Sequence, residues 1–285
     1  MPPGQGSILV GLIGEGIALS RTPAMHEAEA ARQGQTLVYK LLDTARMTPR
    51  APELADLLEY ARHLGYAGLN ITYPFKQAVV PLLDELSDIA RTLGAVNTVV
   101  MKGGRLAGYN TDYWGFRESF QVGMRGELRE NVLLIGAGGA GAAVAQALLD
   151  VGVQRLMLAD TDAARARALA DTLNARFPGR QVLDAADVEE AAACADGIVN
   201  ATPVGMAKLP GTPIPVRWLK PAHWVVDIIY FPMETEFLRA ARAMGCRASN
   251  GSGMAVLQAA RAFEHFTGLS PDADAMRRTF ECFGD

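Results

Sequence analysis

Short apolar segments alternate with helix-length segments along almost all of the 285 residues. In the first half we expect strands at 8–14, 36–42, 67–71 and 95–101, and helices at 23–33, 52–64 and 111–122. In the second half we expect strands at 131–135, 155–159, 197–200 and 224–229, and helices at 139–151, 162–177, 253–266 and 272–280. This alternation is typical of α/β proteins with parallel sheets. The length and the glycine-containing segment 123–129 predict two α/β domains joined by a linker, with a cleft between them.

Composition excludes several classes of protein. The formal charge of −4 lacks the basic excess of a nucleic-acid binder. The four histidines have no metal-ligand spacing, so no metal is expected. The cysteines form no C-x-x-C pair, which favours a reducing compartment and predicts a cytoplasmic protein; they are Cys194, Cys246 and Cys282. A homodimer is compatible with the sequence.

One apolar stretch, 132–149, is long enough to span a bilayer. Its four glycines are clustered at one third of its length, which indicates a strand, a turn and a helix instead. The apolar N-terminal stretch has no Lys or Arg before Arg21 and contains Glu15, so we expect neither export nor membrane attachment.

The glycine cluster Gly136-Ala-Gly138-Gly-Ala-Gly141 fits G-x-G-x-x-G between a predicted strand and helix. Such glycines permit a tight turn and close approach of a pyrophosphate to the helix N-terminus. The alternative is a glycine-rich helix start that binds nothing. Because Asp160 ends the next predicted strand, where a carboxylate can accept both ribose hydroxyls, we expect a dinucleotide site.

Asp160 also bears on the choice of nicotinamide cofactor. Its charge would repel a 2′-phosphate, which favours NAD. Arg165 and Arg167 follow closely and suit a phosphate, which favours NADP. They could equally form an exposed helical face, with Asp162 three residues before Arg165. The position of the carboxylate is the stronger indication.

Polar residues gather at predicted element ends in the first half. Lys76 follows the strand ending in Asn70-Ile-Thr72, where α/β folds bind ligands, but it could also be a solvated lysine at a helix start. Asp112 precedes a predicted helix and could act as its N-cap. The hydroxyls of Ser20 and Thr22 have the same alternative role as caps.

Seven ordered motifs together resemble the shikimate/quinate dehydrogenases over essentially the whole chain. They are Ser20-x-Thr22-Pro23, Asn70-x-Thr72-x-Pro74-x-Lys76, Gly94-Ala-Val-Asn97-Thr98, Asn110-Thr-Asp112, Gly136–Gly141, Asn200-Ala-Thr202-Pro203 and Gly251-x-Gly253-Met254-x-x-x-Gln258. The resemblance implies a substrate-binding domain of residues 1–122 with 252–285, because a C-terminal helix returns to it. It implies a Rossmann-type, doubly wound cofactor domain over 123–251.

The resemblance also implies an activity, the reversible oxidation of one ring hydroxyl of a cyclic hydroxy acid by a nicotinamide cofactor. It makes Lys76 and Asp112 the catalytic pair. The implied substrate-binding residues are Ser20, Thr22, Asn70, Thr72, Asn97, Tyr230 and Gln258, with Tyr230 placed by the looser match Asp227-Ile-Ile-Tyr230. The implied cofactor-binding residues are Gly136, Ala137, Gly138, Gly139, Ala140, Asp160, Arg165, Thr202, Pro203 and Gly253.

Two positions depart from the family pattern. NADP-dependent members commonly carry Asn-Arg-Thr where this chain has Asp160-Thr-Asp162, which strengthens the prediction of NAD. Shikimate-specific members usually have serine at the position of Thr22, so we expect both quinate and shikimate to be substrates. The alternatives are an NADP-dependent biosynthetic shikimate dehydrogenase and a catalytically silent regulator; retention of Lys76 and Asp112 argues against the regulator.

Overall fold

The computed structural model describes residues 6–283, which form two compact units. Unit 1 contains residues 6–111 and 256–283, and unit 2 contains residues 112–255. Two helices contain the boundaries, α4 (Thr111–Gly123) and α9 (Ser252–Thr267). The expected linker at 123–129 follows α4, whereas the units divide at the start of this helix. That one domain binds the substrate and the other the cofactor stays a prediction.

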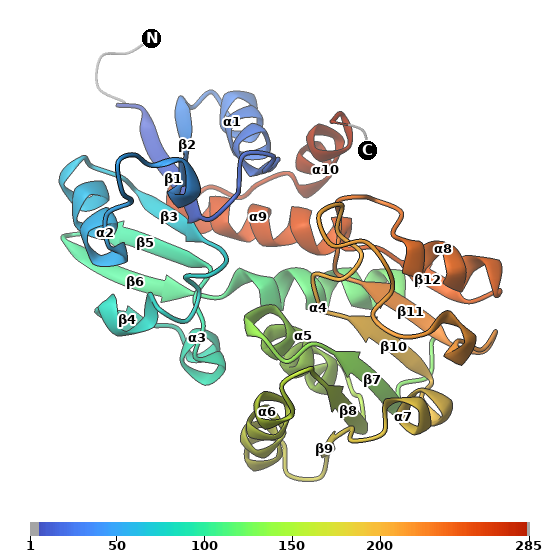
Figure 1. Cartoon of the computed structure of the whole chain (residues 1–285). Helices are drawn as coiled ribbons and strands as arrows, with labels where there is room; N and C mark the ends of the chain where they lie inside the picture. Colours follow the sequence, from blue (N-terminus) through green and yellow to red (C-terminus); the bar gives the residue numbers. More distant parts are fainter. Residues whose placement is uncertain (1–5, 284–285) are drawn as a thin grey trace. The chain divides into compact units, whose positions relative to one another are not determined.

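Unit 1 is built on a six-stranded sheet in the order β2-β1-β3-β5-β6-β4 (Figure 1). Its strands are β1 (Ile8–Gly14), β2 (Leu37–Asp43), β3 (Gly68–Ile71), β4 (Glu85–Leu86), β5 (Thr98–Lys102) and β6 (Arg105–Tyr109). β1 pairs in parallel with β2 and β3, but β5 is antiparallel to both β3 and β6. The sheet is therefore mixed, whereas the alternation of strands and helices in the sequence predicted a parallel sheet. β5 and β6 form a hairpin through Gly103 and Gly104, both with positive φ.

Helices cover both faces of this sheet. They are α1 (Thr22–Arg32), α2 (Leu54–His63), α3 (Asp88–Leu93), α9 and α10 (Ala273–Glu281), with single 3₁₀ turns η1 (Thr44–Arg46) and η2 (Val80–Leu82). Pro23 lies in the first turn of α1, where its missing N–H costs least. On one face Phe263 of α9 packs with Val10, and on the other Leu57 of α2 packs with Ile13.

Unit 2 is built on a six-stranded, entirely parallel sheet in the order β12-β11-β10-β7-β8-β9 (Figure 1). The strands are β7 (Asn131–Ile135), β8 (Arg155–Ala159), β9 (Gln181–Asp184), β10 (Gly197–Asn200), β11 (Trp224–Asp227) and β12 (Arg247–Ser249). The helical segments are α5 (Gly139–Asp150), α6 (Ala163–Arg176), α7 (Val188–Cys194), η3 (Val216–Trp218) and α8 (Glu236–Ala243). The chain reverses its direction of winding between β7 and β10, which is the Rossmann arrangement. Ligands bind such sheets at this reversal, beyond the carboxyl ends of the strands.

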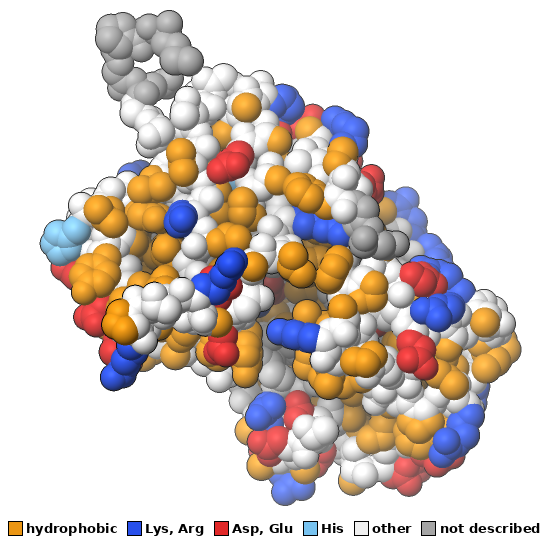
Figure 2. Space-filling model, turned by 45° about the horizontal axis from the view of Figure 1, so that its top comes forward, with side chains coloured by type: hydrophobic (Ala, Val, Ile, Leu, Met, Phe, Trp, Pro, Cys, Tyr) orange, Lys and Arg blue, Asp and Glu red, His pale blue; other side chains and the backbone are white. Residues whose placement is uncertain are grey.

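The apolar stretch 132–149 is β7, a turn and α5, as expected. Within residues 6–283, no helix has both the length and the apolar character needed to cross a membrane. Acidic and basic side chains are interspersed on the face shown in Figure 2.

Candidate functional site

The turn between β7 and α5 uses its three motif glycines in two different ways. Gly136 has φ +101°, and a Cβ there would lie 2.8 Å from the carbonyl oxygen of Ala201. A Cβ on Gly141 would overlap the carbonyl oxygen of Gly136. Around Gly138, by contrast, a Cβ would meet no described atom within 4 Å. Gly138 is the N-cap of α5, so its open space adjoins the positive end of the helix and fits a phosphate group.

Asp160 lies directly after β8, and its carboxylate is bonded to the glycine turn. Its Oδ2 accepts the N–H of Ala137 at 2.7 Å, and its Oδ1 accepts the N–H of Asp162 at 2.9 Å. Burial alone would raise the pKa of Asp160, but these donors and the Arg165 guanidinium lower the pKa below its ordinary value. The carboxylate is therefore ionised at neutral pH. Its Oδ1 also accepts the Thr161 hydroxyl at 3.4 Å, a bond that a ribose hydroxyl could replace, and its Oδ2 has a second lone pair for another.

Both arginines that could favour a 2′-phosphate are engaged with carboxylates. Arg165 lies 3.6 Å from Asp160 and 3.4 Å from Asp162, and its side chain is 54% exposed. Arg167 pairs with Asp184 at the end of β9, at 3.2 Å. Asp162 is the N-cap of α6, so the charged cluster belongs to the start of this helix.

The loop after β10 is held by the side chain of Asn200. The Asn200 Oδ1 accepts the N–H of Thr202 at 3.0 Å and its hydroxyl at 2.7 Å, and its Nδ2 donates to the carbonyl of Val204 at 3.0 Å. Because Ala201 adjoins Gly136, Thr202 and Pro203 lie on the same edge of the sheet as the glycine turn. The adjacent strand β11 is followed by Tyr230, a partly exposed side chain.

In unit 1, the predicted residues Asn70, Asn97 and Gln258 belong to one hydrogen-bond network. Asn70 accepts the hydroxyl of Tyr39 at 2.7 Å and donates to the Asn97 carbonyl at 3.2 Å. Asn97 Nδ2 donates to Thr111 Oγ1 at 3.0 Å and to Gln258 Oε1 at 3.3 Å. These bonds tie the end of β3 to the starts of β5 and α4 and to α9.

Asp112 lies in the first turn of α4 and is buried. The preceding residue, Thr111, is the first of this helix, and its N–H donates to Asn97 Oδ1 at 2.7 Å. Asp112 is thus inside the helix and not the cap before it. An acidic residue in a first turn is also stabilised by the helix dipole.

Lys76 and Thr72 lie in the segment after β3. The N–H of Thr72 donates to the Ile13 carbonyl at 2.9 Å, and the Lys76 carbonyl accepts the N–H of Val96 at 2.8 Å, one residue before Asn97. Residues around Lys76 form turns, and no regular helix starts there. The Lys76 side chain is half-buried, so it is not the fully solvated helix-start lysine of the alternative interpretation.

Ser20 and Thr22 lie where the loop after β1 enters α1. The N-cap of this helix is Arg21, which makes no side-chain cap bond, but Ser20 Oγ accepts the N–H of Thr22, the first helical residue, at 3.4 Å. The Asp43 carboxylate holds the loop by accepting the N–H groups of Gly16 at 2.8 Å and Ile17 at 3.1 Å. The capping alternative is therefore wrong for Thr22, which lies inside the helix, whereas the Ser20 hydroxyl does bond to one N–H at the helix start.

Gly253 has a packing role in unit 2. A Cβ there would overlap Ser119 Oγ of α4.

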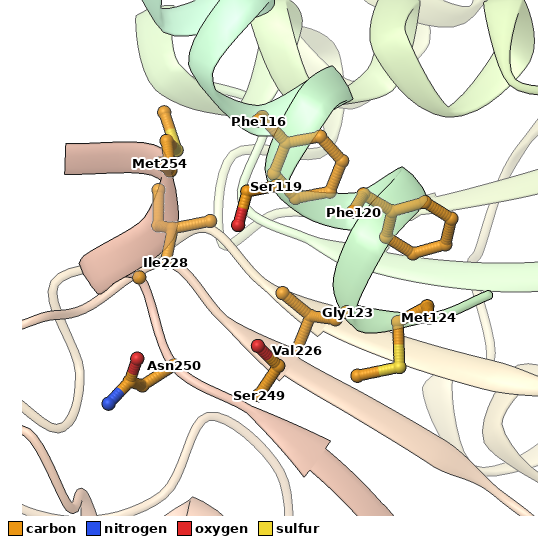
Figure 3. Close-up of a pocket in the computed structure, with 11 residues that line it drawn as sticks. Phe116, Ser119, Phe120, Gly123, Met124, Val226, Ile228, Ser249, Asn250 and Met254 are labelled. Carbon is orange, nitrogen blue, oxygen red and sulfur yellow. The ribbon is translucent and has the colours of Figure 1, made fainter. Parts of the chain in front are cut away.

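A small pocket nearby carries no charged side chain and contains none of the predicted site residues (Figure 3). It is lined by α4, the ends of β11 and β12, and Met254. The predicted residues lie elsewhere, in unit 1 after β1 and β3 and in unit 2 after β7, β8 and β10. Among residues 6–283, no group of three or more His, Cys, Asp or Glu side chains could hold a metal ion.

Sequence reasoning missed three residues of these networks: Tyr39, Asp43 and Thr111. Asp43 had a detectable signal, because it is an acidic residue at the end of a predicted strand. Tyr39 had no such signal in the sequence, because its hydrogen-bond partner Asn70 is 31 positions away in the chain.

Three family descriptions match successive parts of the chain. Residues 12–99 match "Shikimate dehydrogenase substrate binding domain", residues 123–207 match "Shikimate / quinate 5-dehydrogenase", and residues 251–279 match "Shikimate 5'-dehydrogenase C-terminal domain". The first match lies in unit 1 and the second in unit 2.

Full-length relatives include enzymes named for either cofactor. The quinate/shikimate dehydrogenase (NAD(+)) of Corynebacterium efficiens is 53% identical over 96% of this chain and 98% of its own. The shikimate dehydrogenase (NADP(+)) of Streptomyces avermitilis is 49% identical over 95% and 94%. The solved structure of quinate dehydrogenase from Corynebacterium glutamicum in complex with NAD has a TM-score of 0.90 at 51% identity, covering 97% of this chain and 99% of that one.

Proposed function

This chain belongs to the shikimate/quinate dehydrogenase family, and we propose that it catalyses the NAD-dependent, reversible oxidation of a ring hydroxyl of quinate and shikimate, giving 3-dehydroquinate and 3-dehydroshikimate. The observation that supports this most directly is the turn of unit 2, with open space at Gly138 and an ionised carboxylate, Asp160, bonded to Ala137. Such a turn suits a dinucleotide whose ribose carries two free hydroxyls.

Unit 2 holds the cofactor in this proposal. The backbone of the glycine turn binds the pyrophosphate, and Asp160 accepts from the adenine ribose. The remaining contacts come from Ala137, Gly139, Ala140, Arg165, Thr202, Pro203 and Gly253. When bound, NAD supplies an acceptor for the hydride that leaves the substrate carbon.

The choice of NAD rests on Asp160 more than on overall similarity, because relatives of both cofactor types are similarly close. The Asp160 side chain is 7% exposed and its carboxylate is held ionised, so a 2′-phosphate would meet a fixed negative charge. Arg165 and Arg167 already pair with carboxylates. The NADP alternative therefore has less support.

Unit 1 binds the substrate in this proposal, through the polar groups at the strand ends. Ser20 and Thr22 offer hydroxyls to the ring carboxylate. Asn70, Thr72, Asn97 and Gln258, with Tyr230 of unit 2, bind the ring hydroxyls. Loss of hydride from an alcohol carbon requires that the hydroxyl also lose its proton, and we assign this proton transfer to Lys76 and Asp112.

The decisive assay is NADH formation, followed by absorbance, when the purified protein is mixed with NAD and either quinate or shikimate. We expect turnover with both acids and lower kcat/KM with NADP than with NAD. Tight NAD binding without turnover of any cyclic polyol acid would instead identify a regulator. Higher efficiency with NADP would refute the assignment of the cofactor.

Gly138→Ala is expected to weaken NAD binding at least tenfold with no loss of stability, because the new methyl group fills only the space proposed for the pyrophosphate. Calorimetric titration with NAD and thermal unfolding measure the two effects. Gly141→Ala is the contrasting variant, since its Cβ overlaps a backbone oxygen and should lower Tm. Unchanged NAD affinity in Gly138→Ala would contradict this placement.

Thr22→Ser is expected to shift the quinate/shikimate ratio of kcat/KM towards shikimate and to leave KM for NAD unchanged. The threonine methyl shapes the end of the pocket where quinate carries its additional hydroxyl. A pocket that does not bind this hydroxyl specifically discriminates by about a hundredfold or less. Steady-state kinetics with both acids provide the ratio, and an unchanged ratio would remove Thr22 as the determinant.

Two further properties belong to the proposal. We place the enzyme in the cytoplasm because its free cysteines include exposed Cys194 and Cys282, and exposed thiols persist in reducing compartments. The homodimer compatible with the sequence is tested by light scattering, which separates the mass of one chain from twice that mass.

A further inference from the structure

A fully buried carboxylate, Asp227, lies at the end of β11 in unit 2. Its Oδ1 accepts the Asn200 Nδ2 at 3.0 Å and the N–H of Ile229 at 3.1 Å. Its Oδ2 accepts the hydroxyl of Thr235 at 2.8 Å. One side chain therefore bonds to the ends of two neighbouring strands and to the start of α8.

On the β10 side, the bond reaches the loop proposed to bind the cofactor. Asn200, which donates to Asp227, is the residue whose amide also holds Thr202 and Val204. The Thr202 hydroxyl in turn accepts the N–H of Val204 at 3.1 Å. The orientation of the Asn200 amide thus depends on Asp227 and sets the path of residues 201–204.

On the β11 side, Asp227 closes residues 228–235 into a loop. It binds the second residue of this loop, Ile229, and the last, Thr235. Thr235 is also the N-cap of α8, because its hydroxyl accepts the N–H of Leu238 at 3.2 Å. Tyr230 is carried between these two attachment points.

We propose that Asp227 is a positioning residue that holds loops 201–204 and 228–235 in the single arrangement needed to bind the nicotinamide cofactor. This inference rests on the proposed function. Asp227 itself touches neither cofactor nor substrate in this account. It acts through Asn200 and through the backbone of Ile229.

The charge state of Asp227 makes this role testable. Burial is the largest influence and raises the pKa of Asp227 to about 6, although the donors Ile229, Thr235 and Asn200 lower it. These three groups are neutral. The charged side chains of the neighbouring elements are Glu236 and Arg239 of α8 and the ion pairs Glu234–Arg242 and Glu127–Arg247. β10 carries no charged residue.

Protonation of Asp227 replaces one acceptor with a donor, so the bonds to Thr235 and Asn200 cannot all persist. We expect the affinity for NADH to fall as the pH drops through about 6. Asp160 does not account for this dependence, because its pKa lies below the ordinary carboxyl value. The free energy of unfolding depends on pH in the opposite direction to the affinity for NADH. A carboxyl pKa raised from 3.8 to about 6 by folding favours the folded chain at low pH, and this contribution is lost as the pH rises through about 6.

The test compares NADH dissociation constants, measured by fluorescence between about pH 5 and pH 8, for the full-length wild type and Asp227→Asn. Near pH 8 the variant should bind NADH about tenfold more weakly, the effect of one buried hydrogen bond lost. Its affinity should no longer fall below pH 6. Its Tm near pH 8 should equal or exceed that of the wild type, because a buried charge has been removed.

Asp196→Asn is the matched control, because Asp196 precedes β10 at the opposite, amino edge of the same sheet and accepts the N–H of Asn131 at 2.8 Å. It should retain the wild-type affinity and pH dependence. If Asp227→Asn fails to fold, Thr235→Val answers the same question. It removes one donor and should move the fall in affinity to higher pH, and Thr235→Ser should restore the wild-type profile.

Wild-type NADH affinity and pH dependence in Asp227→Asn would overturn the inference and leave the proposed function intact. The same holds if Asp227→Asn does not fold and Thr235→Val has the wild-type profile. If Asp227→Asn binds NADH weakly but has a lower Tm and the pH dependence of the wild type, the role of Asp227 is merely structural. That result would also overturn the inference. A wild-type protein that does not bind NADH, or that oxidises neither quinate nor shikimate, would instead contradict the proposed function.

Discussion

Lys76→Ala is expected to lower kcat by about two to four orders of magnitude, the loss typical of an acid/base group. Unit 1 holds Lys76 half-buried in a turn whose backbone is bonded to Val96, beside Asn97. A lysine amine is able to transfer a proton, whereas an arginine guanidinium stays charged. Steady-state kinetics with NAD and either acid, in both directions, measure the effect.

Lys76→Arg separates the two roles that a lysine can have. If Lys76 transfers a proton, the arginine variant should remain almost as slow as the alanine variant, because guanidinium does not titrate. If Lys76 only binds substrate, kcat should persist in Lys76→Ala while KM rises. Lys102→Ala, at the exposed end of β5 in the same unit, is the control and should retain wild-type rates.

Asp160→Asn is expected to narrow the preference for NAD over NADP by about one to two orders of magnitude. The removed repulsion between the carboxylate and a 2′-phosphate is worth ~1–3 kcal/mol. An asparagine can still accept the N–H of Ala137 through its one oxygen, so the bond to the glycine turn is kept while the bond to Asp162 is lost. Arg165 keeps its nearer partner, Asp162. The ratio of kcat/KM for the two cofactors measures the change.

Asp184→Asn provides the control for this experiment. Asp184 ends the next strand, β9, and pairs with Arg167, so the variant removes an equal charge one strand further out. Its cofactor ratio should equal that of the wild type. A wild-type ratio in Asp160→Asn as well would show that shape, and not charge, excludes NADP.

Local patterns in the sequence predicted the four inner strands of the second sheet, β7, β8, β10 and β11, but missed its edge strands β9 and β12 and the helices α7 and α8. Its strands and helices alternate regularly, and the parallel sheet, glycine turn and carboxylate at Asp160 follow from spacing alone. Family resemblance and the comparisons agree on the dehydrogenase family. The β5–β6 hairpin was missed, although Gly103-Gly104 between two apolar runs is a hairpin signal.

Only the tertiary structure decided what individual residues of a motif do. Gly138 and Gly141 are equivalent in G-x-G-x-x-G, yet one leaves open space and the other is forced by a backbone oxygen. Asn70 and Tyr39, and Asp227 and Asn200, meet through hydrogen bonds between residues far apart in the chain. Secondary-structure signals are local, because they depend on backbone preferences and side-chain periodicity over a few residues. Hydrogen-bond partners and the space around a side chain depend on which strands become neighbours, and that is settled only when the sheet forms.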